Sequence, residues 1–391
     1  MDNAAIEQAR RELVARLKQQ GYLRDTRLQE AFEAVPRHLF LPELAPELAY
    51  ADEALPIKYD DDGAVLSSSS QPGMMALMLN QLRLHPGANV LEIGTGTGYN
   101  AAIMQQIVKK KGHVTSIELD AEVHQQAAKN LQRAGVHDVF LVNADGAMGY
   151  APRAAYDRII ATAGIWDVPR AWAQQLRPDG ILVAPIWVDA LQYSAALRPQ
   201  KDGSLYSAIN LPCGFIHLRG MAAAPRLHVR VGGSALVLGG NAVTQMDSAM
   251  LHSLFSEDAE ACHLGERLTP EDYWNHLLTY LMLNPPPDFA FMSFSVSREQ
   301  QAYGMEGHGF GLVANSSACL VPYQGHGEAY CFGGADAFIA LQAALKQWNA
   351  LERPGRDVLR LCLSVGEPTK PHGTVYKRHD HYLDVWQDAG S

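Results

Sequence analysis

Apolar and polar positions alternate in blocks through the middle of the chain. Short apolar runs rich in β-branched residues are typical of buried strands, and the longer mixed runs between them are typical of helices. Strands are predicted at 90–93, 114–118, 139–143, 156–161 and 181–186, helices at 100–104 and 171–176, and a turn at 177–180. Because strands that alternate with helices form parallel sheets, the pattern predicts an α/β fold with a doubly wound, Rossmann-like sheet.

The pattern changes after Arg219. A helix is predicted from Thr269-Pro270, since a Thr cap followed by Pro in the first turn is a helix start, and Pro285 to Pro287 stop it. Further strands are predicted at 234–238, 289–296, 309–313, 317–321, 328–332 and 357–364, with a helix at 335–351. We therefore expect an N-terminal helical segment (1–80), an α/β core (81–225) and a C-terminal α+β domain (226–391).

The first predicted strand ends in Glu92-Ile93 and runs into alternate glycines at 94, 96 and 98, before Tyr99. A glycine loop between a strand and a helix lets the backbone approach a nucleotide. The spacing G-x-G-x-G lacks the third glycine position of a dinucleotide fingerprint, which argues against an NAD-dependent oxidoreductase. It suits S-adenosylmethionine, which has no phosphate.

Two acids follow at the ends of the next strands. Glu118 lies roughly 20 residues beyond the loop, where an acid is expected to bind the ribose hydroxyls. Asp145 ends the third strand, where a carboxylate can accept the adenine amino group. Glu118 as a solvated strand-end charge and Asp145 as a turn or cap residue are the alternatives. The residues expected to contact the cofactor are Glu92, Gly94, Gly96, Gly98, Glu118, Asp145 and Gly146.

Composition narrows the function classes. The chain has 391 residues, enough for two domains, and no apolar run of about 18 residues that would predict a membrane span. Its N-terminus does not resemble a signal peptide, and five scattered cysteines suit reduced thiols, so we expect a cytoplasmic protein. Cysteine and histidine spacings match no zinc pattern, so no metal is expected.

The formal net charge of −10 argues against a nucleic-acid surface. It also means that an acidic substrate must be met by a local basic patch, because the overall field repels it. Lys377, Arg378 and His379 are the candidates for such a patch, and an ordinary polar tail is the alternative.

Several segments resemble the protein-L-isoaspartate O-methyltransferase family, over about residues 10 to 225. They are Val35-Pro36-Arg37-His38, the Tyr50 to Ile57 stretch, Ser70-Gln71-Pro72-Gly73, the glycine loop, Asn143 to Gly146 and Leu176 to Gly180, in the family's order. The resemblance implies an S-adenosylmethionine-dependent methyltransferase sheet and carboxyl methylation. A carboxylate with a pKa near ~4 is ionised at neutral pH and needs no general base.

The resemblance also implies that Ser70 lies at the substrate carboxylate, with Ser69 as the second choice and Gln71 beside them. These residues could instead cap the helix that begins at Pro72. Trp166 departs from the family pattern and is expected to change the wall of the substrate pocket. Lys377 and Arg378 are further candidates for substrate binding.

The chain continues some 165 residues beyond the family domain. Such long forms resemble relatives that accompany lanthipeptides, lasso peptides and graspetides. This implies methylation of an Asp side chain in a ribosomally made peptide, which then closes to an aspartimide. Repair of isoaspartate in damaged proteins is the alternative, and a non-catalytic peptide-binding role is the third. The partner is therefore a peptide or protein with Asp or isoAsp, and the sequence leaves the oligomeric state open.

Overall fold

The computed structural model describes residues 3–296, 302, 305–324 and 327–388. Its first segment is a group of short helices that pack around the start of the chain: α1 (Asn3–Gln19), α2 (Thr26–Ala34), η1 (Arg37–Phe40) and α3 (Pro46–Ala49). Helix α1 is amphipathic, because Leu13 and Leu17 are buried and Ile6 packs against the same core. A hairpin, β1 (Leu55–Tyr59) and β2 (Val65–Ser69), then leads to α4 (Pro72–Leu82).

The predicted parallel sheet is confirmed. Strands β5, β4, β3, β6 and β7 lie side by side in that order, all parallel. The elements of this part are β3 (Asn89–Ile93), α5 (Tyr99–Val108), β4 (His113–Glu118), α6 (Ala121–Arg133), β5 (Val139–Asn143), η2 (Gly146–Met148), η3 (Ala151–Arg153), β6 (Tyr156–Ala161), α7 (Arg170–Gln175) and β7 (Leu176–Val188). Strand order reverses beside β3, which is where such sheets bind ligands.

The turn predicted at 177–180 is wrong. Strand β7 already begins at Leu176, which pairs with Tyr156, and the pairing resumes two residues later in β6 between Arg158 and Ile181. The four residues between the paired positions therefore form a bulge within the strand. Arg177 is held there by an ion pair to Asp157 at 3.3 Å.

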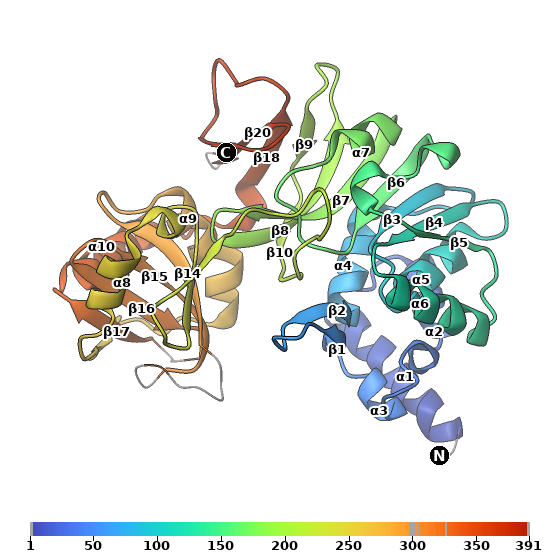
Figure 1. Cartoon of the computed structure of the whole chain (residues 1–391), viewed down its shortest axis with the longest axis horizontal. Helices are drawn as coiled ribbons and strands as arrows, with labels where there is room; N and C mark the ends of the chain where they lie inside the picture. The colour runs from blue at the N-terminus through green and yellow to red at the C-terminus, as the bar shows by residue number, and fades with distance from the viewer. Residues whose placement is uncertain (1–2, 297–301, 303–304, 325–326, 389–391) are drawn as a thin grey trace.

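The sheet does not end at β7. It continues through antiparallel strands β8 (Leu191–Pro199), β9 (Leu205–Ser207), β18 (Leu359–Ser364), β20 (Tyr382–Gln387) and β19 (Thr374–Lys377), while β10 (Asn210–Pro212) also pairs with β8. The result is an eleven-stranded mixed sheet. Its last three strands come from the end of the chain, as the red strands beside the green ones in Figure 1 show.

A second, seven-stranded antiparallel sheet has the order β11-β12-β14-β15-β16-β17-β13. Its region contains β11 (His228–Arg230), β12 (Leu236–Gly239), η4 (Val243–Gln245), α8 (Ser248–Leu254), β13 (Glu260–His263), the π-helical turn η5 (Asp272–Leu277), α9 (Leu278–Leu283), β14 (Ala290–Val296), β15 (Gly307–Val313), β16 (Ser317–Pro322), β17 (Glu328–Gly333), α10 (Asp336–Ala350) and η6 (Arg356–Val358). The predicted strands and helices of this half are confirmed in type.

Residues 226–391 therefore do not form one separate unit, contrary to the expected division. The seven-stranded sheet begins near residue 228, but the strands after residue 358 return to the larger sheet. They do so because β9 offers an unpaired edge, and alternate residues Leu359, Leu361 and Leu363 of β18 bury their side chains against that sheet.

The two sheets share one hydrophobic core. A continuous cluster joins Leu182 of β7, Tyr193 of β8 and Phe310 of β15. The Tyr193 hydroxyl also hydrogen-bonds to Thr279 of α9 at 2.9 Å. Figure 1 shows the seven-stranded sheet on the left and the parallel strands on the right, with β8 running between them. None of the described helices is long and apolar enough to cross a membrane.

Candidate active site

The glycine loop follows β3 at the point where strand order reverses. Gly94, Gly96 and Gly98 have φ values of +93°, +55° and +86°, a region that favours glycine. A Cβ on Gly94 would lie 2.6 Å from the hydroxyl oxygen of Thr162, which donates a 2.6 Å hydrogen bond to the Gly94 carbonyl. The loop is therefore fixed from the neighbouring strand end, and no side chain larger than hydrogen fits there.

Glu118 lies beside this loop at the end of β4. Its carboxylate accepts hydrogen bonds from the Gly96 N–H at 3.0 Å and from the Asp120 N–H at 3.1 Å. These bonds orient the side chain toward a pocket that it lines together with Gly94, Gly96 and Gly146. A Cβ on Gly146 would meet Ile93 at 2.5 Å, so the floor of the pocket is also bare backbone. The carboxylate is suited to accept hydrogen bonds from ribose hydroxyls, and the bare backbone leaves room for the methionine part of S-adenosylmethionine.

Glu92 does not line this pocket, contrary to expectation. It is fully buried one layer below, where its carboxylate accepts hydrogen bonds from Asn100 Nδ2 at 2.7 Å and Ser116 Oγ at 2.5 Å. Burial raises the pKa of the Glu92 carboxyl to about 7. Glu92 therefore supports the loop by joining β4 to the first turn of α5.

Gly98 and Asp145 also lie outside the lining of the pocket. Gly98 starts α5 in the left-handed conformation, packed against Leu131. Asp145 is the N-cap of η2 through the Ala147 N–H at 2.9 Å, which is the alternative role considered above. Its other oxygen accepts the Met221 N–H at 2.8 Å, so the segment around Gly220 lies over this strand end. A contact between Asp145 and adenine stays a prediction.

Ser69 and Ser70 line the other side of the same pocket, at the end of β2. Helix α4 begins after Gln71 with no side-chain cap, so neither serine caps it. Within the described residues the Ser70 hydroxyl makes no hydrogen bond, and it is free to donate to a substrate. The hairpin that carries the serines is held to α6 by Lys58, which contacts Asp120 at 2.8 Å.

Arg37 is the residue that holds both serines, and its role was missed. Its guanidinium is fully buried. It donates to the carbonyls of Ala49 (2.8 Å), Ala51 (3.0 Å), Glu53 (3.3 Å) and Ser70 (3.0 Å), and to the Ser69 hydroxyl (3.3 Å). The Val-Pro-Arg-His segment was the available signal, but it did not reveal what the arginine contacts.

The expected basic patch at the end of β19 is not formed. Lys377 is exposed, but Arg378 is only 5% exposed. Its guanidinium carbon lies 3.4 Å from the centre of the Trp166 ring, and it donates to the Trp187 carbonyl at 2.9 Å. Burial lowers the pKa of Arg378 to about 10. Trp166 and Arg378 thus join the turn between β19 and β20 to the segment that follows β6, and neither residue lines the pocket.

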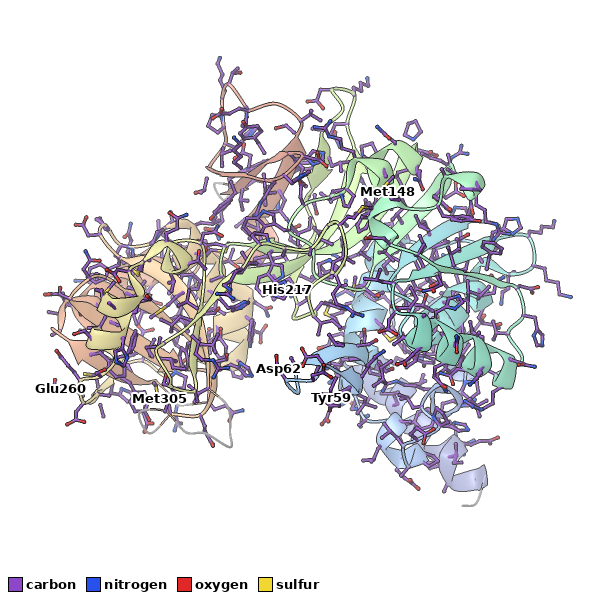
Figure 2. All side chains as sticks on the ribbon, viewed as in Figure 1. Tyr59, Asp62, Met148, His217, Glu260 and Met305 are labelled. Carbon is purple, nitrogen blue, oxygen red and sulfur yellow. The ribbon has the colours of Figure 1, made fainter. Side chains whose placement is uncertain are left out.

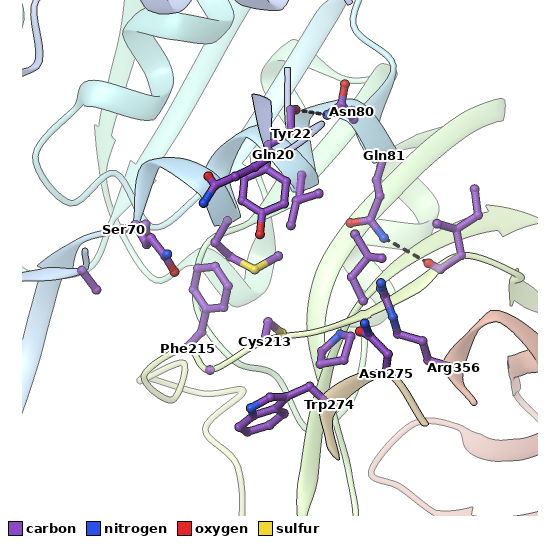
Figure 3. A pocket seen from close by; sticks show the side chains of 18 of the residues that line it. Gln20, Tyr22, Ser70, Asn80, Gln81, Cys213, Phe215, Trp274, Asn275 and Arg356 are labelled. Carbon is purple, nitrogen blue, oxygen red and sulfur yellow. Dashed lines mark hydrogen bonds between the residues drawn. The ribbon is translucent and has the colours of Figure 1, made fainter. Parts of the chain in front are cut away.

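A large cleft opens beside the pocket, with a volume of about 1570 Å³ (Figure 3). Gln71 lines the cleft, and Ser68, Ser70 and Ile216 line both cavities. The opposite wall consists of residues from the C-terminal half, namely Glu271, Trp274, Asn275 and Arg356. Figure 2 shows Tyr59 and Asp62 toward the free end of the β1–β2 hairpin, and His217 between the two halves.

His217 and Arg219 also line the pocket and were not predicted. The His217 ring stacks on Trp187 with centroids 5.1 Å apart, and burial lowers its pKa. Both residues follow the last predicted strand of the core, in a segment without periodicity, so the sequence offered no signal for them. Among the described residues, no three His, Cys, Asp or Glu side chains come together as a metal site.

A glycine loop at the sheet's switch point, an acid at the next strand end and a bare pocket floor define an S-adenosylmethionine-dependent methyltransferase. The chain belongs to the protein-L-isoaspartate(D-aspartate) O-methyltransferase family, whose model matches residues 8–223.

Similar proteins extend this comparison. A protein-L-isoaspartate O-methyltransferase of Hyperthermus butylicus is 40% identical over 227 residues, covering 56% of this chain and 92% of the relative. A protein-L-isoaspartate O-methyltransferase of Methanopyrus kandleri is 39% identical over 221 residues, which cover 56% of this chain and 95% of the relative. A solved structure of a protein-L-isoaspartate O-methyltransferase aligns with 97% of this chain and 99% of its own, with a TM-score of 0.53 and 23% identity. The similarity in fold therefore includes the C-terminal half.

Proposed function

We propose that this chain transfers a methyl group from S-adenosylmethionine to the carboxylate of an isoaspartyl residue in a peptide or damaged protein. The observation that carries the proposal is the position of Ser70, which lines both the cofactor pocket and the open cleft. A carboxylate brought through the cleft to Ser70 would lie at the junction of the two cavities.

Methyl transfer at this junction does not require a side chain that acts as a general base. The substrate carboxylate is already ionised at neutral pH, and S-adenosylmethionine, when bound, supplies an electrophilic methyl group. The Ser70 hydroxyl is a neutral donor that can orient one carboxylate oxygen while the other attacks. Arg37 holds the Ser70 backbone through a 3.0 Å hydrogen bond, so the hydroxyl is positioned in advance. Positioning and exclusion of water are then the main contributions of the protein.

A second candidate is methylation of an Asp side chain in one dedicated, ribosomally made peptide, followed by aspartimide closure. The observation that favours it is that one wall of the cleft consists of Trp274, Asn275 and Arg356, which lie outside the matched residues 8–223. A wall built from residues beyond the family domain can select a particular peptide.

Matched peptides distinguish the two candidates. We would incubate the enzyme and labelled S-adenosylmethionine with two peptides that differ only in carrying isoAsp or Asp at one position. Repair-type activity predicts methylation of the isoAsp peptide alone. Methylation of the Asp peptide, with later loss of methanol, would favour the dedicated-peptide function. Failure to methylate either peptide would count against both candidates for such substrates.

A further inference from the structure

The wall of the cleft opposite Ser70 carries an unpaired cation. Arg356, at the start of η6, points into the cleft in Figure 3 and is partly buried. Within the described residues its guanidinium makes no hydrogen bond and no ion pair. Burial lowers its pKa from the ordinary value, while nearby Asp357 and Glu271 oppose this shift. A partly desolvated guanidinium without a partner is suited to bind a carboxylate, which it can hold through two parallel hydrogen bonds.

Trp274, on the π-helical turn η5, lines the same wall of the cleft as Arg356. Its ring packs against Tyr323, with centroids 4.8 Å apart, yet the side chain remains 40% exposed, and Figure 3 shows it in the cleft. The turn is fixed at its start, where Asp272 accepts hydrogen bonds from the Thr269 N–H and hydroxyl and pairs with Arg353 at 3.1 Å. A tryptophan that is fixed by its neighbours and half exposed is typical of the residues that contribute most to binding in interfaces.

The size and charge of the cleft favour a peptide over a small molecule. A volume of about 1570 Å³ exceeds the range of roughly 300–1,000 Å³ that small ligands occupy. The chain as a whole carries a net charge of −10, which repels acidic peptides. Locally the cleft has Arg24, Arg83 and Arg356 against Asp25 and Glu271, and Asp25 is already paired with Arg27 at 2.5 Å. The charged side chains that line the cleft are therefore positive in sum, whereas the chain as a whole is negative.

We propose that the cleft binds an extended peptide through a second carboxylate, distinct from the one that is methylated. Arg356 binds this second carboxylate, and Trp274 packs against a neighbouring side chain, while the reactive residue lies at Ser70. The inference rests on the proposed function and gives it a substrate class, namely unfolded segments in which another carboxylate lies near the modified residue. An acidic side chain and a free peptide C-terminus present the same chemistry to Arg356.

The test uses direct binding, so that it does not depend on turnover. Calorimetry would measure the affinity of isoaspartyl peptides for the full-length enzyme saturated with S-adenosylhomocysteine. The peptides would carry either Glu or Gln at flanking positions, and either a free or an amidated C-terminus. Wild type is expected to bind the best Glu or free-terminus peptide about tenfold more tightly than its neutral counterpart, as a charged hydrogen bond permits. The arm with the larger effect identifies the source of the carboxylate.

Variants of Arg356 and Trp274 show which residue produces the preference for the charged peptide. Arg356→Gln should abolish the preference for the charged peptide, leave S-adenosylhomocysteine affinity unchanged, and raise KM without lowering kcat if the peptide is methylated. Trp274→Ala should weaken charged and neutral peptides alike. Lys377→Gln is the matched control, because it removes an exposed cation outside the cleft, and it should change nothing. Equal affinities for charged and neutral peptides in wild type, or an undiminished preference in Arg356→Gln, would overturn the proposal. A peptide that binds in this way but is never methylated would instead count against the proposed function.

Discussion

Two buried ionisable residues, Arg37 and Glu92, shape the site although neither of them lines the pocket or the cleft. Arg37 has its charge balanced by backbone carbonyls rather than by an acid, and it thereby fixes the serines at the end of β2. Glu92 has its charge suppressed by burial, and it fixes the first turn after the glycine loop. The family resemblance pointed to the serines, and motif spacing pointed to the glycine loop and Glu118. They could not predict these two supports, because a motif shows which residue is present and not which carbonyl or hydroxyl it meets.

Glu92 makes stability depend on pH in a predictable direction. Its folded-state pKa of about 7 exceeds the value near 4.3 expected in the unfolded chain. The folded protein therefore binds this proton more tightly, so its stabilising contribution is full below about pH 4.3 and is lost as pH rises through about 7. At 1.36 kcal/mol per pKa unit, the free energy of unfolding falls by roughly 4 kcal/mol over this range.

Urea unfolding of wild type and Glu92→Gln at about pH 5 and about pH 8 checks this expectation. Glutamine is neutral at both pH values, so the variant should lack this part of the pH dependence while other groups contribute equally to both proteins. Identical pH dependence in the two proteins would show that Glu92 is already ionised in the folded state.

Among the elements, periodicity predicted strands β3 to β7, β12 and β14 to β18, and helices α5, α7, α9 and α10. It failed where tertiary pairing decides the conformation. Residues 177–180 look like a turn, but strand pairing on both sides makes them a bulge in β7. Strand β8 was missed, although its pairing with β7 is extensive, because the tight turn at Asp189, with φ of +52°, has no glycine to mark it. Strands β19 and β20 flank a polar turn in which Arg378 and His381 are buried against Trp166 and Asp167, and the sequence gives no sign of these contacts.

The loop after β3 can be tested through Gly96. Its φ is +55°, and an added Cβ would lie 3.4 Å from the Ser68 carbonyl. Gly96→Val should therefore strain the loop, place methyl groups in the pocket and weaken S-adenosylhomocysteine binding at least about tenfold in calorimetry. Gly135→Val is the control, because Gly135 has a similar φ of +70° with nothing within 4 Å of the added Cβ. Full affinity in the Gly96 variant would place the cofactor elsewhere.

At the scale of the whole molecule, the end of the chain completes the sheet that carries the site. Hydrogen bonds reach Asp167 from the Asp380 N–H at 2.6 Å and from the His381 ring at 2.9 Å, which docks the β19–β20 hairpin. Although burial opposes the shift, His381 and the backbone amides lower the pKa of the Asp167 carboxyl. The two halves were predicted as separate domains because the sequence gives no sign that β18, near the end of the chain, pairs with β9.

Hydrogen exchange with mass spectrometry tests this arrangement. Asp167→Asn removes a buried charged acceptor, so residues 374–387 should exchange faster by roughly tenfold or more, while residues 317–333 of the seven-stranded sheet keep their protection. Uniform loss of protection across residues 226–388 would instead indicate that the C-terminal half behaves as one unit.

We propose that Ser70 positions a peptide carboxylate beside the cofactor pocket. The most direct test is methyl transfer to an isoaspartyl peptide by wild type and Ser70→Ala, followed by mass spectrometry. Wild type should add one methyl group. The variant should bind S-adenosylhomocysteine normally yet turn over more than about tenfold more slowly, because a lost orienting hydrogen bond costs roughly 1–3 kcal/mol. Methylation at the full rate by Ser70→Ala would show that Ser70 does not orient the carboxylate, and no methylation by wild type would show that isoaspartyl peptides are not its substrates.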